Sequence, residues 1–167
     1  LSLALAGPFF SFGDSEAFRS NSPSSYVFIV DDSYSMRSRI KEKTLFESAI
    51  QFLSNLLTKI PEGSEFSLVL ASHPARTDQD WIAQKNSFEK LIHGLQPTYK
   101  TTDIGYAIEK ATHLLSTASN KKKNLILLTD LNENGWDKEV FLEVSNSLNT
   151  PLQVFDFSKL AMRKNQV

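Results

Sequence analysis

Apolar residues in this chain fall into short continuous runs that are separated by longer stretches with helical spacing. Continuous aliphatic and β-branched runs are typical of strands that are buried on both faces of a sheet. Such runs cover Tyr26–Val30, Phe66–Leu70, Leu125–Leu128 and Leu152–Phe155. The polar segment after the second run contains Trp81–Ala83, which we interpret as a short edge strand.

Between these runs, apolar residues recur every three or four positions, which predicts amphipathic helices. The predicted helices begin at polar residues, namely Thr44 (with Glu47 as a capping box), Asn86 (with Glu89), about Thr102, and Asp137. Strands that alternate with helices favour right-handed crossovers and parallel pairing. The predicted fold is therefore α/β: a three-layer α/β/α, doubly wound, mostly parallel sheet with one antiparallel edge strand.

Composition narrows the functional classes without naming one. A length of 167 residues suits one domain, and a formal net charge of -1 does not predict nucleic-acid binding. The absence of cysteine excludes disulfides, thiolate metal sites and cysteine nucleophiles. The three histidines, His73, His93 and His113, lack a metal-ligand spacing and are interpreted as surface or hydrogen-bonded residues.

The first residues differ from the rest of the chain. Residues 1–10 are apolar and could be the end of a membrane segment, a signal-peptide remnant or an ordinary structural segment. Residues 11–24 are rich in Ser, Asn, Gly and Pro, which is typical of a linker. The expected organisation is therefore a segment 1–10, a linker 11–24 and a folded domain 25–167.

Small oxygen-bearing side chains follow two of the predicted strands and precede one predicted helix. Asp31, Ser33 and Ser35 come after the first strand with the spacing Asp-x-Ser-x-Ser, Asp130 ends the third buried run, and Thr102 precedes the long helix. In a parallel sheet, loops at the carboxyl ends of the strands converge, and binding sites form there. The sequence therefore predicts that these five side chains, called here the candidate site, lie close together.

The candidate site resembles the metal-ion-dependent adhesion site of von Willebrand factor A domains. In that family the first loop reads Asp-x-Ser-x-Ser, a second loop supplies a Thr ahead of a helix, and a third supplies an Asp at a strand end. The resemblance covers about residues 24–157 and implies that Ser33, Ser35 and Thr102 touch a metal through their hydroxyls. It implies that Asp31 and Asp130 bind the metal directly or through water.

The chemistry of these side chains fits the same interpretation. Mg²⁺ is a hard cation that prefers oxygen ligands in octahedral geometry and retains waters, and Mn²⁺ or Ca²⁺ are alternatives. Three neutral hydroxyls and two carboxylates leave such a cation incompletely coordinated. An Asp or Glu of a partner protein could complete the coordination, which predicts a metal-dependent protein-binding module rather than an enzyme.

A narrower resemblance concerns the bacterial Bat-type aerotolerance proteins, which are anchored in the membrane with their A domain on the periplasmic side. It lies in the Ala6–Pro8 end of the apolar segment, the Asp-Ser-Tyr-Ser-Met loop and the run Thr129–Trp136. It implies a location at the bacterial inner membrane with the domain facing the periplasm. The family usually continues beyond Phe157 with another helix and strand, so the C-terminal part is expected to be reduced or cut short.

Other interpretations of the same residues stay open. The acids and serines could cap helices and order turns, which would make the chain a structural domain with a vestigial site. Paired acids at a strand end also occur in phosphatases of the haloacid-dehalogenase type, but their second Asp is replaced here by Ser33. No glycine-rich loop supports nucleotide binding. The neighbouring acids Asp32 and Asp103 are expected to face solvent or cap a helix, and the alternative is that they support the metal ligands from behind.

Overall fold

A parallel sheet forms the centre of the chain in a computed structural model, which describes residues 21–77, 81–132 and 150–159. Its strands lie in the order β4-β1-β5-β6, and every neighbouring pair is parallel. The strands are β1 (Ser25–Val30), β4 (Glu65–Leu70), β5 (Lys123–Thr129) and β6 (Leu152–Asp156). Because the order places β1 between later strands, the chain winds outward in both directions from the first strand.

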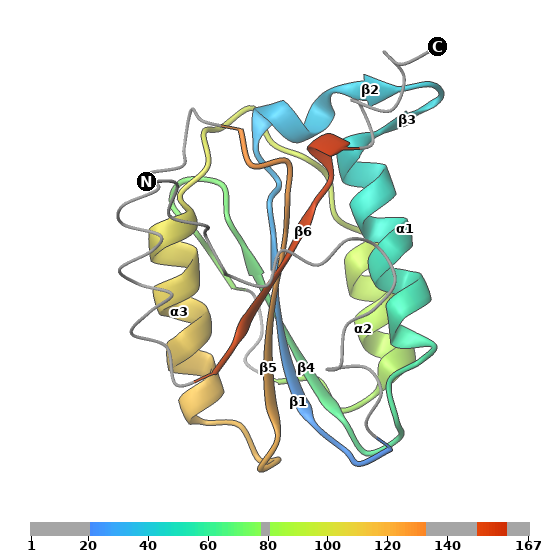
Figure 1. The fold of residues 1–167 in the computed structure, drawn as a ribbon, viewed down its shortest axis with the longest axis vertical. Helices are drawn as coiled ribbons and strands as arrows, with labels where there is room; N and C mark the ends of the chain where they lie inside the picture. The colour runs from blue at the N-terminus through green and yellow to red at the C-terminus, as the bar shows by residue number, and fades with distance from the viewer. Residues whose placement is uncertain (1–20, 78–80, 133–149, 160–167) are drawn as a thin grey trace, which may run out of the picture.

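Helices cover both faces of this sheet (Figure 1). They are α1 (Leu45–Leu57), α2 (Lys85–His93) and α3 (Ile104–Ser116). Alternate residues of β1 point to opposite faces, so that Tyr26 and Phe28 join the core under α1 and α2, whereas Val27 and Ile29 join the core under α3. Burial on both faces explains why β1 shows a continuous apolar run instead of alternation.

The predicted three-layer α/β fold is confirmed, and the four predicted strand runs all lie within observed strands. At the antiparallel edge, two bridges pair the following segment with β4: Ile82 exchanges two backbone hydrogen bonds with Phe66, and Arg76 exchanges two with Leu70. The predicted start of α2 is wrong: α2 begins at Lys85 after the N-cap Gln84, so Glu89 lies too far along the helix to cap it. The Glu89 carboxylate instead accepts a hydrogen bond from Ser54 Oγ at 2.7 Å. The predicted helix at Asp137 lies outside the described residues.

A small antiparallel hairpin between β1 and α1 was not predicted. It pairs β2 (Arg39–Ile40) with β3 (Lys43–Thr44) and follows a short 3-10 helix, η2 (Tyr34–Arg37). Lys41 at its turn adopts a positive φ of 58°. The hairpin leads directly into the predicted capping box, in which Thr44 Oγ1 accepts from the Glu47 amide and the Glu47 carboxylate accepts from the Thr44 amide.

The expected segment 1–10 and most of the linker 11–24 lie outside the described residues. Within the ranges that are described, no helix combines the length and apolar character that a membrane crossing requires.

At the amino end of the sheet, Glu65 joins β4 to β1 and to the loop after α3. Its carboxylate accepts hydrogen bonds from Ser25 Oγ at 2.6 Å, from the Ser119 amide at 2.6 Å and from the Asn120 amide at 3.4 Å. Partial burial acts to raise the pKa of Glu65, but these hydrogen bonds outweigh it and hold the pKa below its ordinary value.

A lowered folded-state pKa means that ionised Glu65 stabilises the fold above the unfolded pKa, and that this stability is lost as the pH falls through the folded pKa. We expect Glu65→Gln to lower the free energy of unfolding by about 1 kcal/mol near neutral pH, at the modest level typical of partly exposed groups. Urea titrations should show the difference shrinking at acidic pH. An equal difference at both pH values would contradict a role for the charge.

Candidate metal centre

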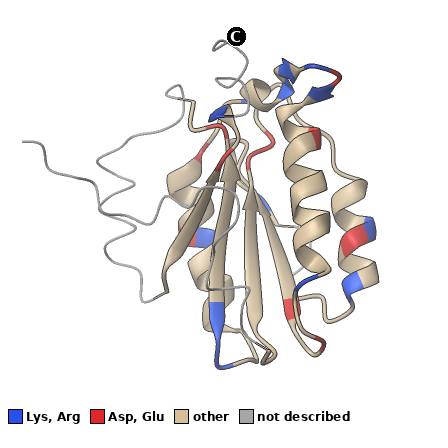
Figure 2. Cartoon of the chain, turned by 45° about the vertical axis from the view of Figure 1, so that its right-hand side comes forward, with Lys and Arg blue, Asp and Glu red and all other residues tan. Residues whose placement is uncertain are grey.

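The candidate site lies at the carboxyl end of the sheet, where the strand ends carry a concentration of acidic residues (Figure 2). Asp31 directly follows β1, and Asp130 directly follows β5. Thr102 lies ahead of α3, in a segment that forms an antiparallel bridge with Ser72 at the end of β4. Three loops that are far apart in the sequence therefore meet at one edge, as predicted.

The five residues form one connected hydrogen-bond network, in which the backbone amide of Ser33 joins two groups of side chains. Asp31 Oδ1 accepts from Thr102 Oγ1 at 3.3 Å and from the Ser33 amide at 3.0 Å. The hydroxyls of Ser33 and Ser35 are 3.2 Å apart, and Ser35 Oγ donates to Asp130 Oδ1 at 3.2 Å. The structure therefore brings together every residue that the sequence placed in the site.

These spacings suit a shared small cation. Oxygens on adjacent corners of an octahedron are about 2.9 Å apart when Mg²⁺ lies at its usual ligand distance. The observed oxygen–oxygen distances of 3.2–3.3 Å are close to that value. Among the described residues, no group of three or more His, Cys, Asp or Glu could hold a metal. A cation at this edge would therefore rely on hydroxyl oxygens as well as on the two carboxylates.

Electrostatics at the site also favour a cation. Asp31 is 1% exposed and Asp130 is 7% exposed. Burial raises the pKa of Asp31; hydrogen bonds from Ser33 and Thr129 oppose this effect, and the negative charge of Asp130 adds to it. Two carboxylates that repel each other in a poorly hydrated place are stabilised when a divalent cation lies between them. The donor set thus fits Mg²⁺ or a similar hard ion.

Thr129 has a positioning role that sequence reasoning did not assign. Its hydroxyl donates to Asp31 Oδ2 at 2.7 Å and accepts from the Leu131 amide at 3.2 Å. Asp31 is thereby held through both carboxylate oxygens, since Oδ1 bonds to Thr102 and Ser33. The sequence Thr129-Asp130 at the end of β5 could have indicated this role, because parallel pairing brings the end of β5 beside the end of β1.

Asp32 does not face solvent, so that part of its prediction is wrong. Its side chain is fully buried and accepts from the Ser72 amide at 2.8 Å, from Ser72 Oγ at 3.1 Å and from Arg76 Nη2 at 3.0 Å. Its carbonyl accepts from the Thr98 amide and hydroxyl. Since Ser72 also bridges to Thr102, Asp32 ties the first loop of the candidate site to the second.

Asp103 caps a helix, as predicted. Its Oδ1 accepts from the Tyr106 amide at 3.2 Å at the start of α3, and its Oδ2 lies 2.9 Å from His73 Nδ1. The His73 side chain is 65% exposed, which agrees with its interpretation as a surface histidine.

An exposed aromatic surface lies beside the candidate site. Tyr34, between the two motif serines, is 63% exposed, and its ring centroid is 6.1 Å from that of Tyr99, which is 76% exposed. The Arg37 guanidinium lies over the Tyr99 ring at 4.1 Å and donates to the Pro97 carbonyl at 3.0 Å. The Tyr34 amide donates to the Lys100 carbonyl, which fixes η2 against the loop that leads to Thr102.

The parallel α/β sheet and the three loops that form the candidate site are the features that the sequence resemblance to von Willebrand factor A domains implied. Comparison with protein-family models points to the same family. The model of the von Willebrand factor type A domain matches residues 26–133, which is more than half of the chain. The chain therefore belongs to the von Willebrand factor type A family. The matched range contains the whole candidate site. No curated protein sequence matches the chain at a significant level.

Solved structures show the same fold at low sequence identity. BatB, a conserved hypothetical protein from Bacteroides thetaiotaomicron, is 20% identical with a TM-score of 0.63, over 78% of this chain and 63% of that one. An aerotolerance-related membrane protein from Bacteroides fragilis is 20% identical with a TM-score of 0.62, over 78% and 64%. The von Willebrand factor domain of the type V pili tip protein Mfa5 from Porphyromonas gingivalis is 24% identical with a TM-score of 0.53, over 66% and 38%. The chain thus spans less than two thirds of each of these structures.

Proposed function

We propose that this domain binds a divalent cation, most simply Mg²⁺, at the candidate site and uses it to capture an acidic side chain of a protein partner. The observation that carries the proposal is that hydrogen bonds connect Asp31, Ser33, Ser35, Thr102 and Asp130 at one edge of the sheet. Hydroxyl ligands neutralise little of the charge of a cation, so the bound ion would keep its attraction for an external carboxylate.

A location at the bacterial cell envelope is part of the proposal. It is supported by the similarity in fold to an aerotolerance-related membrane protein and to a type V pili tip protein. The proposed role there is protein binding, with the full protein anchored in the inner membrane and this domain on the periplasmic side.

A metal-dependent phosphohydrolase has less support. Such an enzyme would need a second acid beside Asp31 that can exchange protons with substrate or water. The neighbouring Asp32 is fully buried, and its carboxylate is occupied by Ser72 and Arg76. We therefore propose a binding module rather than an enzyme. A structural domain with a vestigial site is the remaining alternative, and the response to metal separates the two.

Thermal unfolding with and without Mg²⁺ tests the proposal. At a concentration about a hundredfold above the dissociation constant, a ligand of the folded state adds about 2.7 kcal/mol to the free energy of unfolding. For a chain of this size that corresponds to a melting temperature higher by roughly 5–10 °C. We expect Asp31→Asn and Thr102→Val to remove most of this rise.

Asp156→Asn is the matched control, because Asp156 ends β6 at the same sheet edge but bonds to Ser158 outside the candidate site. This variant should keep the full response to Mg²⁺. If neither Mg²⁺ nor Mn²⁺ nor Ca²⁺ changes the melting temperature of the unmodified chain, the vestigial alternative is correct.

A further inference from the structure

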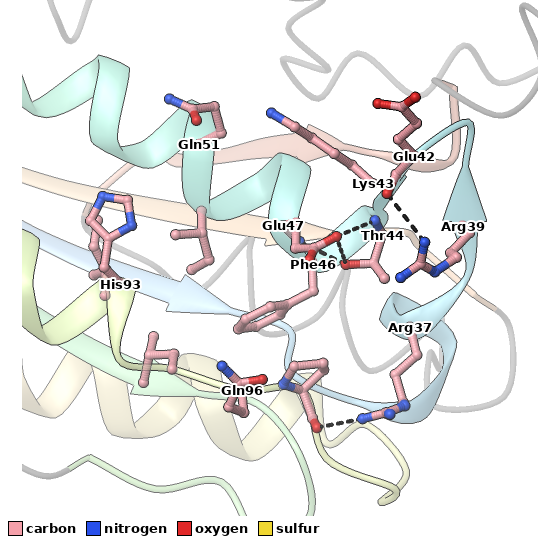
Figure 3. Close-up of a pocket in the computed structure, with 14 residues that line it drawn as sticks. Arg37, Arg39, Glu42, Lys43, Thr44, Phe46, Glu47, Gln51, His93 and Gln96 are labelled. Atoms are coloured by element: carbon pink, nitrogen blue, oxygen red, sulfur yellow. Dashed lines mark hydrogen bonds between the residues drawn. The ribbon is translucent and has the colours of Figure 1, made fainter.

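A groove of about 590 Å³ opens between the β2–β3 hairpin, the start of α1 and the end of α2 with the loop that follows it (Figure 3). This volume is typical of sites that bind small ligands or a few peptide side chains. We call it the hairpin groove. It does not contain any of the five residues of the candidate site.

The hairpin groove has an apolar floor. Phe46 and Ile50 of α1 and Ile92 of α2 line it, and Leu95 and Pro97 extend it along the loop after α2. Phe46, Ile50 and Ile92 belong to the core between the helices and the sheet, so the floor is fixed by the packing of the fold. Because Phe46, Ile50 and Ile92 are only 0–7% exposed, the apolar surface open to an occupant comes mainly from the partly exposed Leu95 and Pro97.

The rim of the groove carries three cations beside the two carboxylates of Glu42 and Glu47. Arg37, Arg39 and Lys43 line it, and within the described part of the chain none of the three forms an ion pair with an Asp or Glu. Arg39 donates instead to the carbonyl of Glu42. The Glu47 carboxylate caps α1 by accepting from the Thr44 amide at 2.6 Å, and its pKa is lowered by the hydrogen bonds from Thr44 and, to a lesser extent, by the charges of Arg39 and Lys43. The rim therefore carries one more cation than carboxylates, and an acidic segment would compete with Glu47 for Arg39 and Lys43.

Arg37 connects the hairpin groove to the candidate metal centre. It belongs to η2 together with Ser35, so the same short helix supplies a residue to each place. Its guanidinium donates to Pro97 in the groove and lies over Tyr99, whose ring neighbours that of Tyr34. A chain segment that leaves the metal centre across these exposed rings would therefore reach the groove.

We propose that the hairpin groove binds an extended segment of the partner protein that contains acidic and apolar residues, next to the acidic residue captured by the metal. This proposal rests on the proposed function and specifies the partner. Apolar side chains of the segment occupy the floor, and its carboxylates pair with Arg39, Lys43 and Arg37. Charge complementarity at a rim of this kind sets specificity and the rate of association.

The probe is a fluorescein-labelled octapeptide in which Glu and Leu alternate, and its binding to the chain in Mg²⁺ is followed by fluorescence polarisation. We expect the double variant Arg39→Glu/Lys43→Glu to weaken binding by about tenfold or more, because like charges then face each other. The milder double variant Arg39→Gln/Lys43→Gln should weaken it by a smaller factor. The same peptide with Gln in place of Glu should bind the unmodified chain more weakly than the Glu peptide does, because it lacks the charges that the rim attracts.

Lys59→Glu/Lys122→Glu is the matched control. It changes the net charge equally at two exposed lysines, beyond the end of α1 and ahead of β5. It should bind the probe as the unmodified chain does. Equal binding by all variants, or no binding of the probe by the unmodified chain, would overturn the proposal, and so would a dimer that charge reversal at the groove converts to a monomer. The Mg²⁺-dependent melting temperature, measured on the same samples, reports separately on the proposed function.

Discussion

Replacing Asp32 with Ala is expected to lower the free energy of unfolding by about 2–4 kcal/mol, somewhat less than the roughly 3–5 kcal/mol known for breaking a fully buried ion pair. The change leaves the buried Ser72 amide without its acceptor and deprives Arg76 of its partner. The side chain of Arg76 is 39% exposed and can turn to water, which keeps the effect below the upper limit for a fully buried pair. Urea unfolding at neutral pH measures it.

The ion pair between Lys85 and Glu62 provides the control for this prediction. It has the same 3.0 Å separation as the pair between Arg76 and Asp32, but the Glu62 side chain is 92% exposed, whereas that of Asp32 is 0% exposed. We expect Glu62→Ala to change the free energy of unfolding by less than about 1 kcal/mol. Similar effects of the two substitutions would show that burial does not determine the strength of the Asp32 network.

Asp32→Ala should also reduce the rise in melting temperature with Mg²⁺. Asp32 holds Ser72, and Ser72 bridges to Thr102 of the candidate site. Glu62 lies in the loop between α1 and β4 and is not part of the candidate site. Glu62→Ala should therefore leave the response to Mg²⁺ unchanged. A full response in Asp32→Ala would mean that Thr102 keeps its position without this link.

The fold could be predicted because its strands are buried on both faces. The residues of β1 alternate between two cores, so each position is apolar and the strand appears as an unbroken run. The candidate site could be predicted because its residues follow strand ends, and parallel strands bring their ends to one edge whatever the distance along the chain. The hydrogen bond from Ser35 to Asp130 spans 95 residues.

The hairpin and the Asp32 network could not be predicted, for two different reasons. Strands of two residues show no periodicity, and the β2–β3 turn has Lys41 at positive φ where a Gly or Asn would have signalled it. Asp32 was misplaced because its partner Arg76 lies in a polar segment without helical or strand spacing. Only the fold shows that this segment turns back along β4, where Arg76 bridges to Leu70.

Replacing Phe88 with Ala is expected to be the most destabilising of these substitutions, at about 3–5 kcal/mol. The Phe88 side chain is fully buried, with ring centroids 5.6 Å from Phe28 and 5.2 Å from Phe66, so it fills the space between α2 and two strands. Removing the ring leaves a cavity among side chains that are held by the sheet and cannot collapse into it. The total free energy of unfolding of a typical domain is only about 5–15 kcal/mol, so we expect the melting temperature to fall by roughly 10 °C.

Phe88→Leu should recover part of this loss, since most of the cavity is filled again. Tyr99→Ala removes a ring of similar size that is 76% exposed and contacts Arg37, and it should cost no more than about 1 kcal/mol. The contrast isolates burial from the loss of an aromatic ring as such. If Phe88→Ala proved no more costly than Tyr99→Ala, α2 would not be packed on β1 and β4 through Phe88, and the α2 side of the hairpin groove would lose its fixed position.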